Sequence, residues 1–335
     1  MLFGGAQQRY IAVAHSVSPF VSVYPWSSLG FGTKFTNPAT LPAGIGRSVA
    51  FSPAGTEIVV GHTSSPNISA YPWSASGFGT KFTDPATVPT AGGLSVAFSP
   101  AGTEIAVTCS SFPTIVAYPW SSSGFGTKFA NPSGPTSDAG NGVAFSPDGT
   151  RIVMAHDNLD YTYAWAWSSS GFGAAYGPPG TLPTGDGKGV AFSPAGTQIA
   201  IAHTTTPFVS AYPWSSGSYF GSKFANPATL PANDANGVAF SPAGTQIAIC
   251  HSSDPTITAY PWSASGFGTK FSNPGTLLSD TGSGIAFSPA GTEIAVSILS
   301  TPFVGSYAWS ASGFGTKFSN PSTLPTGQGN GIAFG

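Results

Sequence analysis

Charged residues are scarce in this sequence. Asp, Glu, Lys and Arg together make up 7% of the 335 residues, whereas a typical soluble domain carries about 25%. The formal net charge is −2, so no basic field is available to neutralise nucleic-acid phosphates or to attract an anionic membrane. No apolar run reaches the length of a membrane-spanning helix. We therefore expect neither nucleic acid nor a membrane as a partner.

A secretory signal is also not expected. The segment MLFGGAQQRY lacks the basic start and the apolar stretch that such a signal has. Aromatic residues make up 13% of the chain, which excludes a disordered protein. With so few charges, the surface must be built mainly from Ser, Thr, Asn and Gly. Surfaces of this kind suit extracellular or virion proteins, and the compartment itself stays open.

The tryptophans reveal an internal repeat. At intervals of 47 or 48 residues the chain places Trp26, Trp73, Trp120, Trp167, Trp214, Trp262 and Trp309. A period near 47 occurs in four-stranded propeller blades and also in helical HEAT and armadillo repeats. The 44 Gly and 31 Pro residues would interrupt helices every few residues, so the pattern favours strands.

Each repeat contains four short segments that are rich in β-branched and aromatic residues and are separated by turn residues. Examples of the first three are Gly142–Ser146, Arg151–His156 and Ile68–Trp73. The fourth is expected to begin near Lys81, after a Gly-Phe-Gly-Thr hairpin. Apolar side chains occupy both faces of Ile115–Trp120, as a sheet between two neighbouring sheets requires. The Pro of each Tyr-Pro-Trp lacks an N–H, so we expect a bulge or a strand end there.

These features predict an all-β fold, a seven-bladed β-propeller with four-stranded antiparallel blades in a single domain, 1–335. The chain starts on a second-strand segment, Tyr10–His15, and stops on a first-strand segment, Gly331–Phe334. The C-terminal strand should therefore join the N-terminal blade and close the ring without a free sheet edge. Blade 1 would comprise about residues 1–47 plus 331–335, and each further blade about 47 residues.

The repeats resemble those of the WD40 propeller family. Val143–Thr150 and Ala97–Thr103 resemble the first WD40 hairpin, and the later Tyr-Pro-Trp-Ser is similar to the Trp-Asp end of the third strand. The resemblance covers nearly the whole chain and implies the propeller fold. Ser follows the Trp in every blade and the Gly-His pair is missing, so the WD40 side-chain network does not carry over. The YPWS and GFGTKF motifs more loosely resemble repeat proteins of bacteriophage virions.

The histidines all occupy one position of the repeat, namely His15, His62, His156, His203 and His251. Neighbouring strands lie about 4.7 Å apart, so copies in adjacent blades should be separated by roughly 10 Å or more. Zinc ligands must reach one ion at about 2.0–2.3 Å, so we expect no metal site and no cofactor. Each His should close a turn through a local hydrogen bond. The alternative is that each His is a polar group in one of a set of equivalent grooves on the surface.

The fourth blade departs from the repeat. Within His156–Trp167 it loses the usual Pro and gains Asp157, Asp160 and Trp165. A unique contact would lie where the symmetry is broken, although drift alone would produce the same differences. We take His156, Asp157, Asp160 and Trp165 as candidate binding residues, together with the other four histidines.

Other repeated positions have simpler explanations. Aromatic rings beside Asn and Ser can stack on sugars, but rings that recur in nearly every blade also suit packing between blades. The string GFGTK lacks phosphate-loop spacing and opens a strand, so it does not indicate nucleotide binding. We expect the Lys of this string to be solvated and to prevent the outer strand from pairing with another sheet edge. Cys109 and Cys250 fall in blades that are not neighbours, which excludes a disulfide between them.

The function expected from these patterns is non-catalytic. An enzyme needs an asymmetric set of reactive groups, whereas here most polar types are spread by repetition and acids number only 12. We expect no catalytic residues and a scaffold for protein–protein interaction or surface attachment, such as a phage virion structural protein or adhesin, with a protein partner or self-assembly. The alternative is a multivalent carbohydrate-binding lectin that binds glycans through avidity. A catalytic site, if present, would have to lie in the fourth blade.

Overall fold

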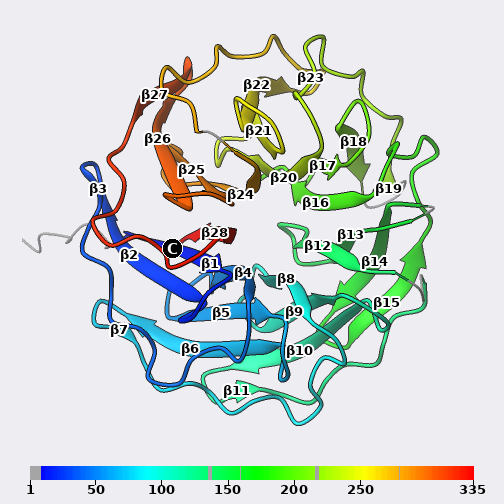
Figure 1. Ribbon diagram of the computed structural model, residues 1–335. Helices are drawn as coiled ribbons and strands as arrows, with labels where there is room; N and C mark the ends of the chain where they lie inside the picture. Colours follow the sequence, from blue (N-terminus) through cyan, green and yellow to red (C-terminus); the bar gives the residue numbers. More distant parts are fainter. Residues whose placement is uncertain (1–8, 135–137, 159, 216–218, 279) are drawn as a thin grey trace, which may run out of the picture.

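The computed structural model shows seven four-stranded antiparallel sheets arranged as blades around a central channel (Figure 1). This confirms the predicted seven-bladed propeller. Residues 1–8, on which the expectation about a secretory signal rests, lie outside the described residues. No helix in the described part of the chain could span a membrane. The structure describes residues 9–134, 138–158, 160–215, 219–278 and 280–335.

Every blade contributes an innermost, a second, a third and an outer strand. The innermost strands are β4 (Gly46–Phe51), β8 (Gly93–Phe98), β12 (Gly140–Phe145), β16 (Gly187–Phe192), β20 (Ala235–Phe240), β24 (Gly282–Phe287) and β28 (Gly329–Phe334). The second strands are β1 (Arg9–His15), β5 (Glu57–His62), β9 (Glu104–Cys109), β13 (Arg151–His156), β17 (Gln198–His203), β21 (Gln246–His251) and β25 (Glu293–Ile298). The third strands are β2 (Val21–Ser27), β6 (Ile68–Ser74), β10 (Ile115–Ser121), β14 (Thr162–Ser168), β18 (Val209–Ser215), β22 (Ile257–Ser263) and β26 (Val304–Ser310). The outer strands are β3 (Gly30–Phe31), β7 (Gly77–Phe78), β11 (Gly124–Phe125), β15 (Gly171–Tyr176), β19 (Tyr219–Phe220), β23 (Gly266–Phe267) and β27 (Gly313–Lys317).

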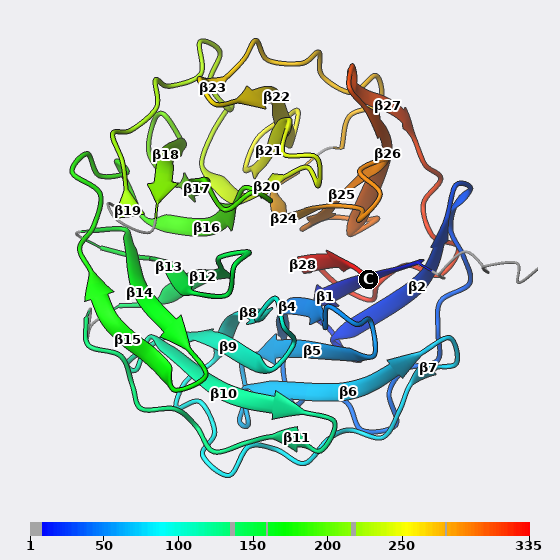
Figure 2. The same cartoon turned by 180° about the vertical axis from the view of Figure 1, so that it is seen from behind.

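The two ends of the chain close the ring, as predicted. Strand β28 pairs with β1 from Ile11 opposite Phe334 onward (Figure 2). Beyond this ladder, the backbones of Tyr10 and Gly335 exchange two hydrogen bonds of 2.9 and 3.0 Å. Blade 1 therefore takes its innermost strand from the opposite end of the sequence, so β1 is not left as an unpaired edge.

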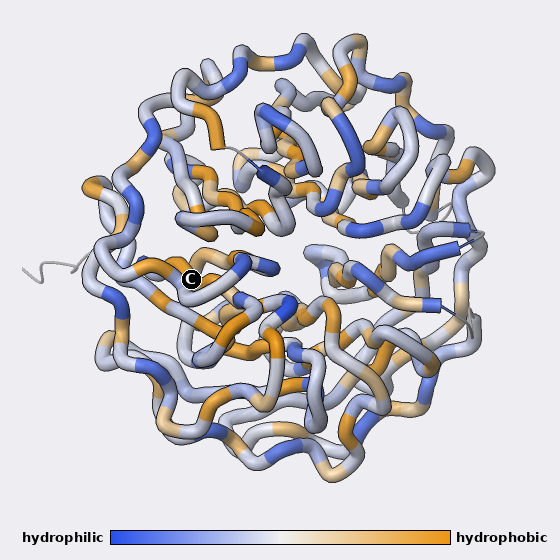
Figure 3. Tube along the Cα trace, in the orientation of Figure 1, coloured by the Kyte–Doolittle hydropathy of each residue, from blue (hydrophilic) through white to orange (hydrophobic). Residues whose placement is uncertain are grey.

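The core lies between the blades. Hydrophobic residues gather along the strands, while hydrophilic residues mark the connecting loops (Figure 3). Trp73 shows the repeated contact: its ring meets Phe78 of its own blade at 4.9 Å and Phe35 of the preceding blade at 5.0 Å, both edge-to-face. Such pairs bury large apolar surfaces in a favoured ring geometry. The repeated aromatic residues therefore account for the packing of each blade against the next.

The outer strand differs from the prediction. We expected it to begin near Lys81, but β7 consists of Gly77 and Phe78, within the segment predicted as a hairpin. The carbonyl of Pro72 accepts a hydrogen bond from Gly79 N at 2.8 Å. On an extended strand the amide nitrogen of Pro72 faces the same side, where it has no hydrogen to donate. The proline therefore ends the outer ladder after two residues.

Candidate functional site at the channel mouth

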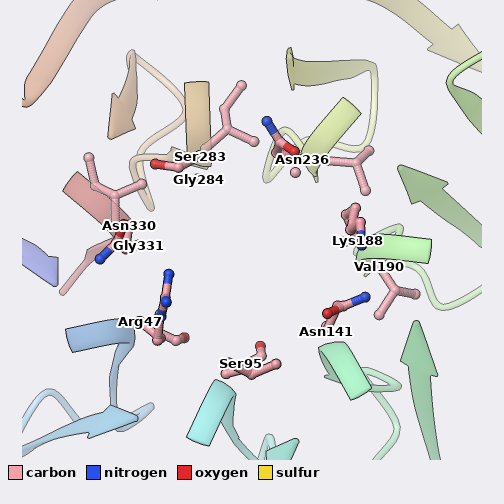
Figure 4. A pocket seen from close by; sticks show the side chains of 18 of the residues that line it. Arg47, Ser95, Asn141, Lys188, Val190, Asn236, Ser283, Gly284, Asn330 and Gly331 are labelled. Atoms are coloured by element: carbon pink, nitrogen blue, oxygen red, sulfur yellow. The ribbon is translucent and has the colours of Figure 1, made fainter. Parts of the chain in front are cut away.

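One end of the central channel is formed by the first residues of the innermost strands. In every blade the pairing of this strand shifts by one residue at its start, as between Gly46 and Ser48 in β4 and between Gly329 and Gly331 in β28. The extra residue points its side chain into the channel. We call these seven residues the channel ring; in chain order they are Arg47, Leu94, Asn141, Lys188, Asn236, Ser283 and Asn330 (Figure 4).

The channel ring lines two connected cavities. An inner one of about 180 Å³ also reaches the backbone of the innermost strands. A wider one of about 300 Å³ lies among the ring residues and reaches Thr281 and Leu299 of blade 7. Amides, hydroxyls, apolar side chains and two cations form their combined walls.

Four ring members join neighbouring blades. Each donates a side-chain hydrogen bond to the backbone carbonyl that opens the innermost strand of the next blade. Asn141 donates to Gly187 at 2.8 Å, Asn236 to Gly282 at 2.8 Å, Asn330 to Gly46 at 2.8 Å, and Ser283 to Gly329. These contacts fix the positions of the blades around the channel.

Arg47 and Lys188 are the charged members of the ring. They belong to β4 and β16 and reach in from opposite sides of the channel (Figure 4). Arg47 is exposed, and among the described residues its guanidinium has no ion-pair or hydrogen-bond partner. It is therefore free to bind an anionic group.

Lys188 is paired with acids of the fourth and fifth blades. Its ammonium lies 2.6 Å from Asp157 Oδ1 and 3.8 Å from Asp186 Oδ2. Asn141 Nδ2 donates to the same Asp157 Oδ1 at 2.6 Å. We call these four residues the Asp157 cluster. The Asp157 side chain is 32% exposed and contacts two residues that line the cavity, Asn141 and Lys188.

The candidate His156 is joined to this cluster. Its Nδ1 lies 2.7 Å from the Asp157 carbonyl oxygen, so the tautomer with a proton on Nδ1 donates a hydrogen bond there. In the usual His partner position, seven residues on, this blade has Tyr163 in place of a small hydroxyl residue. The structure thus brings together two of the predicted residues, His156 and Asp157, and adds Asn141, Asp186 and Lys188.

The other four histidines stay within their own blades. Each is fully buried and shares a hydrogen bond through Nε2 with a hydroxyl seven residues further on. The pairs are His15–Ser22, His62–Ser69 and His203–Ser210 at 3.0 Å, and His251–Thr258 at 2.9 Å. Burial lowers the pKa of each ring to about 4. These rings are neutral at physiological pH and separated from one another, which agrees with the predicted local role.

The remaining candidates of the fourth blade lie apart from the channel. Trp165 is buried, and its Nε1 donates to the Ser133 carbonyl at 2.6 Å. The other six blades have at this position a Tyr whose hydroxyl donates to a loop carbonyl in the same way. Asp160 lies on the turn between β13 and β14, where its carbonyl accepts a bond from Thr162 N. Trp165 therefore has a packing role in this structure.

The potential metal ligands and the two cysteines of the described part of the chain form neither a metal site nor a reactive thiol. No group of three or more His, Cys, Asp or Glu residues that could hold a metal ion occurs there. Cys109 and Cys250 are both free and buried, and burial raises the pKa of each thiol to about 12. A thiol with such a pKa is a poor nucleophile at neutral pH.

The sequence interpretation missed the channel ring. The ring members recur at the period of the tryptophans, immediately after the residue that opens each innermost strand. The informative signal was that charge and size vary at this position while its neighbours barely change. Arg47, Leu94 and Lys188 stand where other blades have Asn or Ser.

Fold and site together define a seven-bladed propeller with a polar, charge-bearing channel mouth. Solved structures with this fold include a protein from Bacteroides fragilis named "putative 6-phosphogluconolactonase", with a TM-score of 0.75, 14% identity and 98% coverage of each chain. A second such protein, from Bacteroides uniformis, has a TM-score of 0.74, 15% identity and coverage of 98% of this chain and 100% of that one. The periplasmic gluconolactonase of Pseudomonas aeruginosa has a TM-score of 0.74, 14% identity and coverage of 97% and 99%. No protein-family model and no curated protein matches this sequence.

These comparisons correct the functional expectation. The expected non-catalytic scaffold, phage virion protein or adhesin, and the alternative lectin, are contradicted by propellers of the same fold that carry lactonase names. The expectation that the chain is not an enzyme is contradicted by the same finding. The physical reason is that repetition spreads residue types without making the ring uniform, since the seven side chains at the channel mouth are of five residue types. The resemblance to WD40 repeats is confirmed only as a propeller fold, and a protein partner or self-assembly stays a prediction.

Proposed function

We propose that this protein is a lactonase that binds a sugar-derived lactone at the channel mouth and hydrolyses it. The observation that carries the proposal is the pair of cations on the cavity wall, Arg47 free and Lys188 held by carboxylates. The lactonase names of propellers with the same fold support the choice of reaction. The identities of 14–15% establish only the fold, so the activity rests on the site.

The cavity wall suits the chemistry of ester hydrolysis. When water attacks a lactone carbonyl, negative charge develops on the carbonyl oxygen, and fixed cations or hydrogen-bond donors stabilise it. Lys188 lines the cavity, and its ammonium can provide this stabilisation. The side-chain amides and hydroxyls of the channel ring can bind the hydroxyl groups of a sugar acid.

Arg47 should give the site a measurable preference for substrates that carry an anionic group. A guanidinium binds phosphate or carboxylate through two parallel hydrogen bonds. We propose that Arg47 binds an anionic group of the substrate, such as the phosphate of a 6-phosphogluconolactone, on the side of the channel opposite Lys188.

The test is hydrolysis of glucono-δ-lactone and 6-phosphoglucono-δ-lactone. The rate is measured as release of acid at constant pH, and the rate of spontaneous hydrolysis is subtracted. Replacing Arg47→Ala should raise KM for the phosphorylated lactone roughly tenfold or more, because a charge-assisted hydrogen bond contributes about 1.5–3 kcal/mol. The effect on the uncharged lactone should be smaller. Lys317→Ala removes a cation from the outer strand and should leave both rates unchanged. Rates equal to the spontaneous background for both lactones would contradict the proposal.

A further inference from the structure

The Asp157 cluster contains a carboxylate with one anchored and one free oxygen. Oδ1 accepts hydrogen bonds from Asn141 and from Lys188, each at 2.6 Å. Among the described residues, nothing donates to Oδ2. A carboxylate held in this way is fixed in orientation, and the Asp157 side chain is 32% exposed. From this geometry we propose, building on the proposed function, that Asp157 is the general base of the reaction and that Asn141 is its positioning residue.

The backbone of Asp157 is fixed as well. Its N–H donates to the Ala139 carbonyl at 3.1 Å, and its own carbonyl accepts the bond from His156. Side chain and main chain are therefore both held before any substrate binds. Such preorganisation is what a general base needs, because misplacement by about 1 Å can cost a factor of roughly 10² in rate.

No other blade has a carboxylate at this place. The residue that follows the histidine position is a hydroxyl residue or a leucine elsewhere, namely Ser16, Thr63, Ser110, Thr204, Ser252 and Leu299. Lys188 is also unique in the channel ring. The acid and its cation therefore occur together, at the junction of the fourth and fifth blades, and nowhere else around the ring.

The reaction balances with these groups alone. A water molecule gives a proton to Asp157 Oδ2 while its oxygen forms a bond to the lactone carbonyl carbon. Lys188 stabilises the negative charge on the carbonyl oxygen. The ring C–O bond then breaks, and the departing oxygen takes a proton from Asp157, which restores the carboxylate. The products are a hydroxyl group and a carboxylic acid that ionises into the solvent, so one lactone and one water give one hydroxy acid.

Blade 6 provides a matched control for Asn141. Asn236 Nδ2 donates to Gly282 O at 2.8 Å, as Asn141 donates to Gly187 O, and its second contact is with Ser252 Oγ at 3.3 Å in place of Asp157. The two asparagines therefore have the same structural role between blades. They differ in whether they hold a carboxylate.

The experiment compares four variants in the lactone hydrolysis assay, with substrate affinity and thermal unfolding measured alongside. Asp157→Asn and Asp157→Ser should lower kcat by about 10²-fold or more, a typical effect for a general base, with little change in KM. The serine variant carries a residue that other blades have at this place, so it keeps the test valid if the asparagine variant fails to fold. Asn141→Ala should lower kcat roughly tenfold or more. Asn236→Ala, which also changes the cavity wall but removes no contact with a carboxylate, should lose similar thermal stability and affect KM rather than kcat.

Three results would overturn this inference. Full kcat in a folded Asp157 variant would show that another group is the base. Equal losses of kcat in the Asn141 and Asn236 variants would assign Asn141 a structural role alone. A wild-type protein without lactonase activity would remove the proposed function and this inference with it, whereas an active wild type with unaffected variants would remove only the inference.

Discussion

The residue that ends the second strand and the residue seven positions further on tend to change together from blade to blade. In four of the five blades whose second strand ends in a buried His, the third strand has a small hydroxyl residue, as in His62 and Ser69 at 3.0 Å. The fifth, blade 4, has Tyr163 there, and His156 bonds to the Asp157 carbonyl. Where blade 3 has Cys109 the partner is Val116, and where blade 7 has Ile298 the partner position is a glycine. A buried imidazole needs a hydrogen-bond partner, whereas an apolar side chain needs none. The blade therefore tolerates loss of the His only when the hydroxyl is lost with it.

The buried histidines predict that the fold loses stability in mild acid. Four of them, His15, His62, His203 and His251, have a pKa lowered from 6.5 to about 4 in the folded state. Between these values the unfolded chain binds more protons than the folded one, so the free energy of unfolding rises with pH and falls as the pH drops from about 6.5 to 4. Each His should contribute roughly 1 kcal/mol or more to this fall. Urea titrations between pH 7 and pH 4 measure it.

A double substitution isolates one histidine. The variant H62C/S69V copies the Cys–Val pair of blade 3 into blade 2 and should weaken the pH dependence while keeping the fold. S69V alone leaves a buried imidazole without its partner and should destabilise the protein at neutral pH. A pH dependence that is unchanged in the double variant would show that the histidines do not cause it.

Among whole strands, the outer one varies most in length. The same six residues, Gly-Phe-Gly-Thr-Lys-Phe, form the two-residue β7 in blade 2 and the five-residue β27 in blade 7. The preceding third strand carries Pro72 in one case and Ala308 in the other. The five blades with Pro at this position all have two-residue outer strands, and the two with Ala have strands of six and five. The length of the outer strand therefore depends on one N–H group of its neighbour.

This dependence predicts that Ala308→Pro shortens β27 to two residues. The amides of residues 313–318 should then exchange with solvent deuterium faster, because a proline at position 308 has no N–H to donate to this strand. The cost should be about 1 kcal/mol, the typical net contribution of one hydrogen bond. Ala308→Ser keeps the N–H and serves as the control. Unchanged exchange in the proline variant would show that the outer strand depends on something other than the proline.

The whole molecule is held as a ring by contacts between its two ends. Besides the β1–β28 ladder, Arg9 forms a 2.8 Å ion pair with Glu293, and Asn330 joins blade 1 to blade 2. The Tyr24 hydroxyl donates to the Thr323 carbonyl at 2.9 Å. Since each blade is covered on both sides by its neighbours, opening one junction exposes two blade faces.

Removal of residues 329–335 should therefore destabilise the ring far more than the loss of one strand suggests. The truncated chain would expose the inner edge of β1 and the apolar faces beside it, which favours aggregation. We expect a large drop in the midpoint of thermal unfolding and association detectable by size-exclusion chromatography. As a control, a circular permutant that joins 329–335 directly to β1 keeps every strand and should remain monodisperse. A truncated protein as stable as the full chain would contradict the closure described here.

Much of this protein can be predicted from its sequence, because the relevant information is local and repeated. The spacing of the tryptophans determines the number of blades, and the alternation of apolar segments with Gly and Pro determines strands. The broken repeat of the fourth blade also indicates His156 and Asp157, because their surroundings differ from the other copies. The length of the outer strand was not predicted correctly, since it depends on a hydrogen-bond donor in the neighbouring strand.

Only the tertiary structure shows the candidate site. Arg47 and Lys188 lie 141 positions apart in the sequence and meet across one cavity because the ring closes. Asp157 reaches Lys188 because adjacent blades pack side by side. Because the strand pairing shifts by one residue at the start of the innermost strand, residue 47 and its equivalents in the other blades face the channel. The regular alternation of side chains between the two faces of a strand does not reveal such a shift in the sequence. The sequence by itself therefore determined the ring, and the tertiary structure decided which seven side chains, of five residue types, surround its opening.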